Sequence, residues 1–113
     1  MPLRILMFMV GDILWFERLV EKMPPKFSGC SRLPSGTLRW HKDGVIHRSP
    51  DLVTGEELPA IVWHDGDIAF YVDGMPHRVN GPAFIFNNVD CEWWFTGEFF
   101  GYGLERPENF PKP

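Results

Sequence analysis

The sequence predicts a small, mainly β protein made of antiparallel β-hairpin repeats in a meander, with one short N-terminal helix. Aromatic residues make up 15% of the chain, and large rings favour strands. Short apolar runs alternate with turn signals of the Asp-Gly type, which indicate hairpins. These runs recur at a fixed spacing, which is typical of a repeat architecture. For 113 residues we expect a single domain with one modest core.

The first 34 residues are predicted to hold a strand at 3–10 and a helix at 12–23. Asp12 stands where a helix cap is expected, apolar residues follow at helical spacing, and Pro24 ends the helix. The apolar run at 5–10 is too short to span a bilayer, and no small-residue cleavage site follows it. We therefore expect neither a signal peptide nor a membrane anchor.

Residues 35–101 are predicted to form the hairpins. Three segments each begin and end with a turn signal, and their closing turns are Asp43-Gly44, Asp73-Gly74 and Thr96-Gly97. A His-Arg pair and then a Pro-Ala pair follow each of the first two closing turns. The Pro-Ala pairs at 59 and 82 give a period of 23 residues, with a seven-residue insertion within 49–58 of the first copy. That insertion is polar and acidic, so we expect a surface loop.

A register with two-residue turns throughout, including Asp65-Gly66 and Asn88-Val89, predicts which side chains share a face. The core face is expected to carry Leu38, Trp40, His47, Ile61, Trp63, Ile68, Phe70, Val72, His77, Phe84, Phe86, Cys91, Trp93, Phe95 and Phe100. The opposite face is expected to carry Arg39, His41, Ala60, Val62, Ala69, Tyr71, Ala83, Ile85, Glu92, Trp94 and Phe99. The structural positions of the repeat are Trp40, His47, Phe70, His77, Trp93 and Phe100.

The segment from Phe70 to Ala83 resembles a divergent MORN-type repeat. It is most similar to the variant aromatic-x-x-Asp-Gly-x-x-His-Arg-x-x-Gly-Pro-Ala of uncharacterised phage and large-virus proteins, and the resemblance covers about residues 35–101. Ordinary MORN units have glycines where this chain has Arg48 and Arg78, and the third copy has Phe100-Gly101 in place of His-Arg. The resemblance implies antiparallel hairpins in series and a role as an interaction scaffold.

The His-Arg pairs are predicted to be structural. His47 and His77 fall on the core face, and the third copy has Phe100 at the same position, so the flat ring is what this position uses. Arg48 and Arg78 are predicted to point to the opposite face. Two interpretations stay open for them: each stacks on an aromatic ring or pairs with a carboxylate, or the two form a basic ladder that grips a partner.

The sequence contains no motif for catalysis, a cofactor or a metal. The four histidines have no metal-ligand spacing, and the glycines belong to turns. Cys30 and Cys91 are expected to be reduced thiols of a cytoplasmic protein, with Cys91 in a core strand. Residues 49–113 hold three basic against eleven acidic side chains, which argues against nucleic-acid binding.

The expected partner-binding residues are Arg48, Tyr71, Arg78, Trp94 and Phe99, because a solvated face does not usually expose several large rings. Burial of these rings under the helix at 12–23 stays open as an alternative. The proline-containing tail, 102–113, is expected to be extended or loosely docked.

These observations predict a non-enzymatic protein-interaction module. Small size and the family resemblance favour a phage-type accessory protein that binds and modulates a host protein in the host cytoplasm. Two alternatives remain: a self-assembling scaffold, such as a homodimer, and a small phosphoester hydrolase that uses the His-Arg pairs.

Overall fold

The computed structural model describes residues 27–87 and 89–112, and within these ranges the chain forms antiparallel strands and no helix. The mainly β class predicted from the sequence is confirmed. The strands are β1 (Gly29–Arg32), β2 (Leu38–Lys42), β3 (Val45–Ile46), β4 (Ile61–Val62), β5 (Ile68–Ala69), β6 (Tyr71–Val72), β7 (Met75–Pro76), β8 (Phe84–Phe86), β9 (Asp90–Phe95) and β10 (Glu98–Tyr102). The strand predicted at 3–10 and the helix predicted at 12–23 lie outside the described residues.

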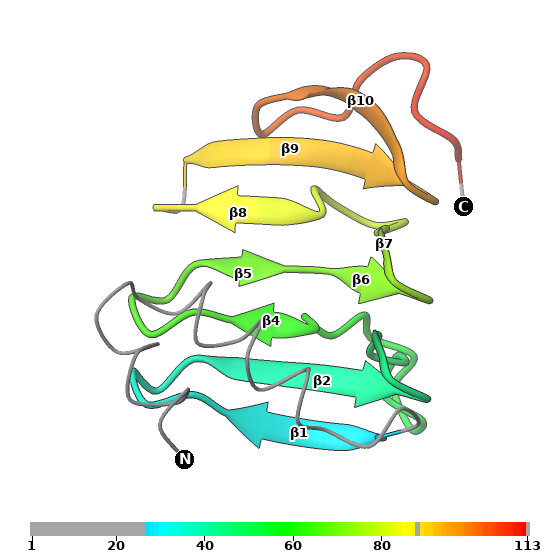
Figure 1. Ribbon diagram of the computed structural model, residues 1–113. Helices are drawn as coiled ribbons and strands as arrows, with labels where there is room; N and C mark the ends of the chain where they lie inside the picture. The colour runs from blue at the N-terminus through cyan, green and yellow to red at the C-terminus, as the bar shows by residue number, and fades with distance from the viewer. Residues whose placement is uncertain (1–26, 88, 113) are drawn as a thin grey trace.

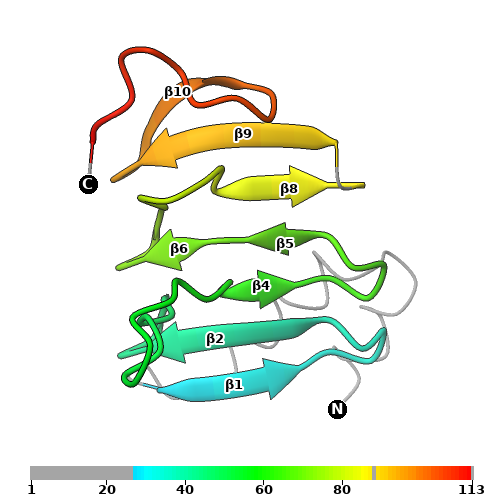
Figure 2. The same ribbon diagram turned by 180° about the vertical axis from the view of Figure 1, so that it is seen from behind.

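The main sheet follows the order of the chain. Its strands pair in the order β1-β2-β4-β5-β8-β9-β10, with β3 on β2, while β6 and β7 form a separate two-stranded ribbon. Figure 1 shows the strands as successive rungs of one layer, and Figure 2 shows the same order from behind. Neighbours in sequence are therefore neighbours in space, and each rung is held mainly by the rungs on either side.

The three closing turns are two-residue hairpins, as predicted. Strand partners flank each of them directly: Lys42 with Val45, Val72 with Met75, and Phe95 with Glu98. The first turn residue has a φ between 48° and 51°, and the glycine after it has a φ between 80° and 85°. Positive φ at both positions is the type I′ geometry, whose twist matches that of the flanking strands.

The prediction of two-residue turns at Asp65-Gly66 and Asn88-Val89 is wrong. In the first, Gly66 has a φ of 96° and donates to the carbonyl of Trp63, while the Trp63 amide donates to Asp67. This is a type I turn closed by a left-handed glycine, and it makes the loop five residues long. In the second, Phe86 pairs with Asp90, which leaves a three-residue loop.

Because these loops have an odd number of residues, the side chains in and beside β4 and β8 lie on the face opposite to the predicted one. One ladder across the sheet joins Leu38, Val62, Ile68, Ile85 and Cys91. The neighbouring ladder joins Arg39, Ile61, Ala69, Phe84, Glu92 and Tyr102. By alternation Trp40, Phe70 and Trp93 lie with the first ladder, which we call the Trp40 face. Tyr71, Trp94 and Phe99 lie with the second, the Tyr71 face.

The predicted faces therefore need correction. Ile61, Trp63, Phe84 and Phe86 were expected beside Trp40, but the observed register puts them on the Tyr71 face. Ala60, Val62, Ala83 and Ile85 move in the opposite direction. Both faces consequently hold core residues, and the most buried apolar side chains are Leu33, Ala60, Ile61, Ala69, Phe70, Ala83, Cys91, Trp93 and Phe110.

Candidate interaction surface

Arg48 and Arg78 make the same two contacts in successive hairpins. The guanidinium of Arg48 lies 3.8 Å from the ring centre of Trp40 and donates to the Pro59 carbonyl at 3.1 Å. That of Arg78 lies 3.9 Å from the ring centre of Phe70 and donates to the Pro82 carbonyl at 3.2 Å. A planar guanidinium can stack on a ring with its face while its edge donates hydrogen bonds.

The two arginines thus lie on the Trp40 face, and the prediction that they point to the opposite face is wrong. Strand alternation fails here because β3 and β7 end at residues 46 and 76, before the His-Arg pairs. The stacking interpretation of these arginines is confirmed, although the rings are Trp40 and Phe70 and not Tyr71.

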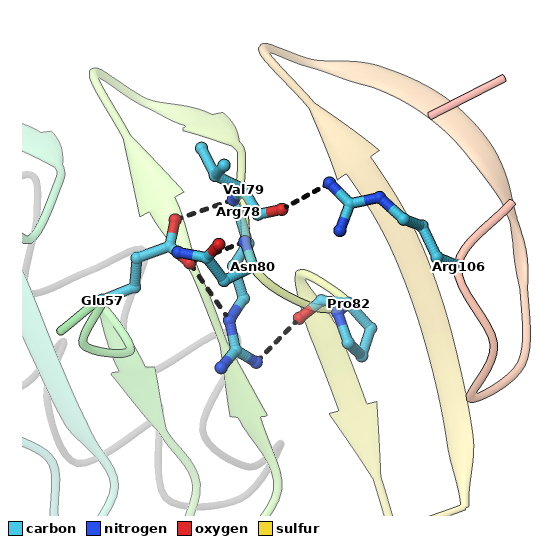
Figure 3. A network of polar contacts seen from close by, with 6 residues as sticks. All are labelled: Glu57, Arg78, Val79, Asn80, Pro82 and Arg106. Atoms are coloured by element: carbon cyan, nitrogen blue, oxygen red, sulfur yellow. Dashed lines mark hydrogen bonds and ion pairs between the residues drawn. The ribbon is translucent and has the colours of Figure 1, made fainter. Parts of the chain in front are cut away.

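Glu57 fixes the acidic loop to the second hairpin (Figure 3). Its carboxylate accepts the backbone N–H groups of Val79 at 2.7 Å and Asn80 at 2.9 Å, and lies 3.6 Å from Nε of Arg78. Arg106 approaches the same segment, between β7 and β8, from the other side and donates to the Val79 carbonyl at 3.1 Å. Burial lowers the pKa of Arg78 and the charge of Glu57 opposes that shift. Arg78 is thus engaged within the fold.

His47 and His77 join each hairpin to the next one. Nδ1 of His47 accepts the backbone N–H of Asp73 at 2.9 Å, and Nδ1 of His77 accepts that of Thr96 at 2.9 Å. The His77 ring also packs on Phe95, with ring centres 4.5 Å apart. The packing role predicted for these rings is therefore only part of their function, because each also supplies a hydrogen-bond acceptor that Phe100 does not have.

The tail, expected to be extended or loosely docked, packs on the third hairpin. Phe110 is only 3% exposed, and its ring centre lies 5.0 Å from that of Trp93 and 5.3 Å from that of Phe100. The Arg106 guanidinium lies 5.0 Å from the Phe110 ring, while the indole N–H of Trp93 donates to the Gly103 carbonyl at 2.7 Å. The tail thus covers the ring that has no His-Arg pair of its own.

Sequence reasoning missed Phe110. The residue stands alone among prolines and charges at the end of the chain, so no periodicity marks it as buried. The one available signal was the missing arginine after Phe100. Arg48 and Arg78 cover the rings of Trp40 and Phe70, and no corresponding arginine is present to cover Trp93.

An unbroken series of ring contacts crosses the Tyr71 face. We call it the aromatic row: Trp63, Tyr71, Phe84, Phe86, Trp94, Phe99 and Tyr102. The ring contacts run from Trp63 through Phe86, Phe84, Trp94 and Phe99 to Tyr102, with Tyr71 also on Phe84, and the ring centres in contact lie between 4.9 and 6.1 Å apart. The structure brings together three of the predicted binding residues, Tyr71, Trp94 and Phe99, and leaves Arg48 and Arg78 on the other face.

The row is most exposed at β10, the last strand of the sheet. Phe99 is 41% exposed and Tyr102 is 77% exposed, whereas Tyr71, Phe84 and Trp94 are half-buried. Rings at the exposed end are held by their neighbours, because Phe99 lies between Trp94 at 5.3 Å and Tyr102 at 4.9 Å. This end of the row presents large apolar surface with restricted side-chain freedom.

Carboxylates border the exposed end of the row. Oε1 of Glu92 accepts the indole N–H of Trp94 at 2.9 Å, and the exposed Asp90, at the start of β9, pairs with Phe86 of the row. Burial raises the pKa of Tyr71; the positive charge of Arg39 works against this shift and the negative charge of Glu92 adds to it. The surface therefore combines aromatic rings with negative charge.

Within residues 27–87 and 89–112, no three His, Cys, Asp or Glu side chains are grouped so that they could hold a metal ion. The same residues include no helix with the length and apolar character needed to cross a membrane. Cys30 on β1 and Cys91 on β9 are both free thiols, and Cys91 is buried in a strand as predicted. Comparison of the chain with protein-family models, with curated proteins and with solved structures finds no match.

Proposed function

We propose that this protein is a non-enzymatic interaction module that binds a basic segment of another protein through the aromatic row. The main support for this proposal is the exposed end of that row, where Trp94, Phe99 and Tyr102 are in ring contact on one face. Phe99 and Tyr102 are too exposed to serve mainly as core. Contiguous exposed rings on a soluble domain mark interaction sites.

Binding through these rings is favoured by the way they are held. Trp94 is fixed by its hydrogen bond to Glu92 and by contacts with Phe84 and Phe99. A side chain that is already restrained loses little rotamer entropy when a partner binds. Buried Trp and Tyr anchors commonly contribute about 2 kcal/mol or more each to an interface.

The charge of the surface argues for a basic partner. Asp90 and Glu92 pair with Phe86 and Tyr102 of the row, and residues 49–113 carry eleven acidic and three basic side chains. Opposite charge accelerates encounter and suppresses partners of the wrong sign. A segment with Lys or Arg beside apolar residues suits this surface best.

The recurrence of the arginine stacks and histidine hydrogen bonds supports a MORN-like hairpin repeat as the scaffold. The contacts of Trp40, His47 and Arg48 are repeated thirty residues later at Phe70, His77 and Arg78. In this proposal the repeat provides the scaffold and the aromatic row is the surface that binds the partner. A phage-type accessory protein that modulates a host protein is the biological role that the resemblance favours.

The experiment compares three tagged baits: the natural chain, a Trp94→Ala/Phe99→Ala variant, and a Leu52→Ala/Val53→Ala variant. The control removes two apolar side chains from the acidic loop, where Leu52 and Val53 are 99% and 93% exposed. A protein retained by the first and third baits is then purified and titrated. We expect the row variant to bind it more than about 30-fold more weakly, equivalent to about 2 kcal/mol.

The proposal fails if every captured protein is retained equally by all three folded baits. Self-association is distinguished by light scattering over a concentration series. A dimer that dissociates in the row variant and persists in the loop variant would make a second copy of this chain the occupant of the row, in place of a basic partner.

A further inference from the structure

A hollow of about 340 Å³ opens beside the exposed end of the aromatic row. Its lining residues are Phe86, Val89, Asp90, Cys91, Glu92, Tyr102 and Gly103. Phe86 is paired with Asp90 across β8 and β9, and Glu92 with Tyr102 across β9 and β10. These pairs lie on the Tyr71 face, so two rings and two carboxylates surround one opening.

The chemistry of this lining is selective. Asp90 and Glu92 supply negative charge, Phe86 and Tyr102 supply ring faces, and the described part of the chain places no Lys, Arg or His in the lining. Carboxylates paired with aromatic rings are the groups that bind guanidinium and ammonium ions in proteins. Anions and phosphates are disfavoured by the same groups.

The carboxylates are available to an incoming donor. Among the described residues, Asp90 makes no side-chain hydrogen bond or ion pair, and Glu92 accepts only the Trp94 indole N–H, through Oε1. Oε2 of Glu92 and both oxygens of Asp90 can therefore accept hydrogen bonds.

We infer that this hollow receives an arginine or lysine side chain of the partner protein, with its cationic end between Asp90 and Glu92 and its aliphatic stem against Phe86 and Tyr102. The inference deepens the proposed function and rests on it. Tyr102 lines the hollow and also contacts Phe99, so the cation and an apolar neighbour can be bound together. The volume, at the low end for ligand sites, suits one side chain.

The test uses a blocked tripeptide, Gly-Arg-Gly, as the probe and Gly-citrulline-Gly as its uncharged isostere. Amide shifts of the full chain are followed by NMR during titration with each probe. We expect saturable shifts centred on residues 89–92 and 102–103 with the arginine probe, and an affinity at least about tenfold lower for citrulline.

Two double variants with equal loss of charge make the test specific. Asp90→Asn/Glu92→Gln keeps an acceptor for the Trp94 indole but removes both charges, and should weaken the arginine probe about tenfold or more. Glu105→Gln/Glu108→Gln removes two acidic charges outside the hollow and should bind like the natural chain. Equal binding of both probes, or equal weakening in both variants, overturns the inference.

The outcome is separable from that of the proposed function. If the arginine probe binds at the hollow while partner capture is unchanged in the Trp94→Ala/Phe99→Ala variant, the inference about the hollow is supported and the proposed function fails. If partner affinity depends on Trp94 and Phe99 but not on Asp90 and Glu92, the proposed function is supported and the occupant assigned to the hollow is wrong.

Discussion

The imidazole Nδ1 of His77 accepts the backbone N–H of Thr96, 19 residues further along the chain, at 2.9 Å. His47 makes the same bond to Asp73, 26 residues further along. In both cases the donor is the first residue of the next type I′ turn, which has positive φ. The histidine therefore couples the position of one hairpin to the conformation of the next turn, a role that its ring shape alone would not fulfil.

Replacing His77 with Phe should lower the free energy of unfolding by about 1–2 kcal/mol, because the Thr96 amide loses its acceptor while the ring contact with Phe95 is kept. Urea denaturation measures the change. His77→Asn keeps a side-chain acceptor for the Thr96 amide but loses the ring contact with Phe95. It should therefore recover only part of the stability that the Phe variant loses. A Phe variant as stable as the natural chain would show that the ring alone matters.

Truncation of Phe110 to Ala should destabilise the protein by about 3 kcal/mol, since a buried ring against Trp93 and Phe100 is removed. Leu104→Ala is the matched control in the same tail. Leu104 is 66% exposed, so its loss should change stability by no more than about 0.5 kcal/mol. Equal effects of the two substitutions in thermal denaturation would contradict the docked tail.

Acidification should destabilise the fold in part through His41. Burial, and then the positive charge of Arg39, lower the pKa of His41 from its ordinary value of 6.5. The unfolded chain therefore binds a proton at His41 more readily than the folded chain does. Its contribution to stability is complete above about pH 6.5 and is lost as the pH falls through the lowered folded-state pKa.

The measurement is the urea midpoint at successive pH values for the natural chain and for His41→Gln. The variant should lose less stability than the natural chain as the pH falls below 6.5, because its residue 41 no longer takes up a proton on unfolding. Parallel curves for the two proteins would show that His41 does not contribute.

The two thiols should differ in reactivity. Cys30 is exposed, whereas Cys91 is buried and has its pKa raised by burial and by the charge of Asp90. Because the thiolate is the reactive form, Ellman's reagent should titrate one thiol rapidly in the native protein and the second only after denaturation. Cys30→Ser should abolish the rapid phase. Two rapid phases in the native chain would place Cys91 at the surface.

The type I′ turns could be predicted from the sequence because their requirement is local. Asp-Gly and Thr-Gly between apolar runs meet the need for positive φ at two successive residues, and no distant contact is involved. The mainly β class followed from the same signals together with the aromatic content.

The sheet face of every side chain could not be predicted, because the dipeptide Asp-Gly occurs both in two-residue type I′ turns and in the longer loop at 63–67. Asp65-Gly66 resembles Asp73-Gly74, yet only Gly66 has positive φ in the first, and its loop is five residues long. One residue of register decides the face of every side chain in a strand. Trp63, Phe84 and Phe86 were thus assigned to the wrong face, so these three of the seven rings of the aromatic row were not recognised as candidates for the site.

The arginines and Phe110 show a second limit of sequence reasoning. Arg48 and Arg78 follow the ends of short strands, where alternation no longer applies, and Phe110 reaches its pocket from the far end of a tail. Tyr71, Trp94 and Phe99 were correctly predicted to share one face, because their positions in β6, β9 and β10 obey strand alternation.

The most direct test of the interaction surface is hydrogen–deuterium exchange of the full chain, alone and bound to the partner identified with the baits. Slower exchange should be confined to β9, the β9–β10 turn and β10, whose side chains form the exposed end of the row. Protection centred on residues 48–58 and 78–82, around the stacked arginines, with no change in β9 and β10, would contradict the account.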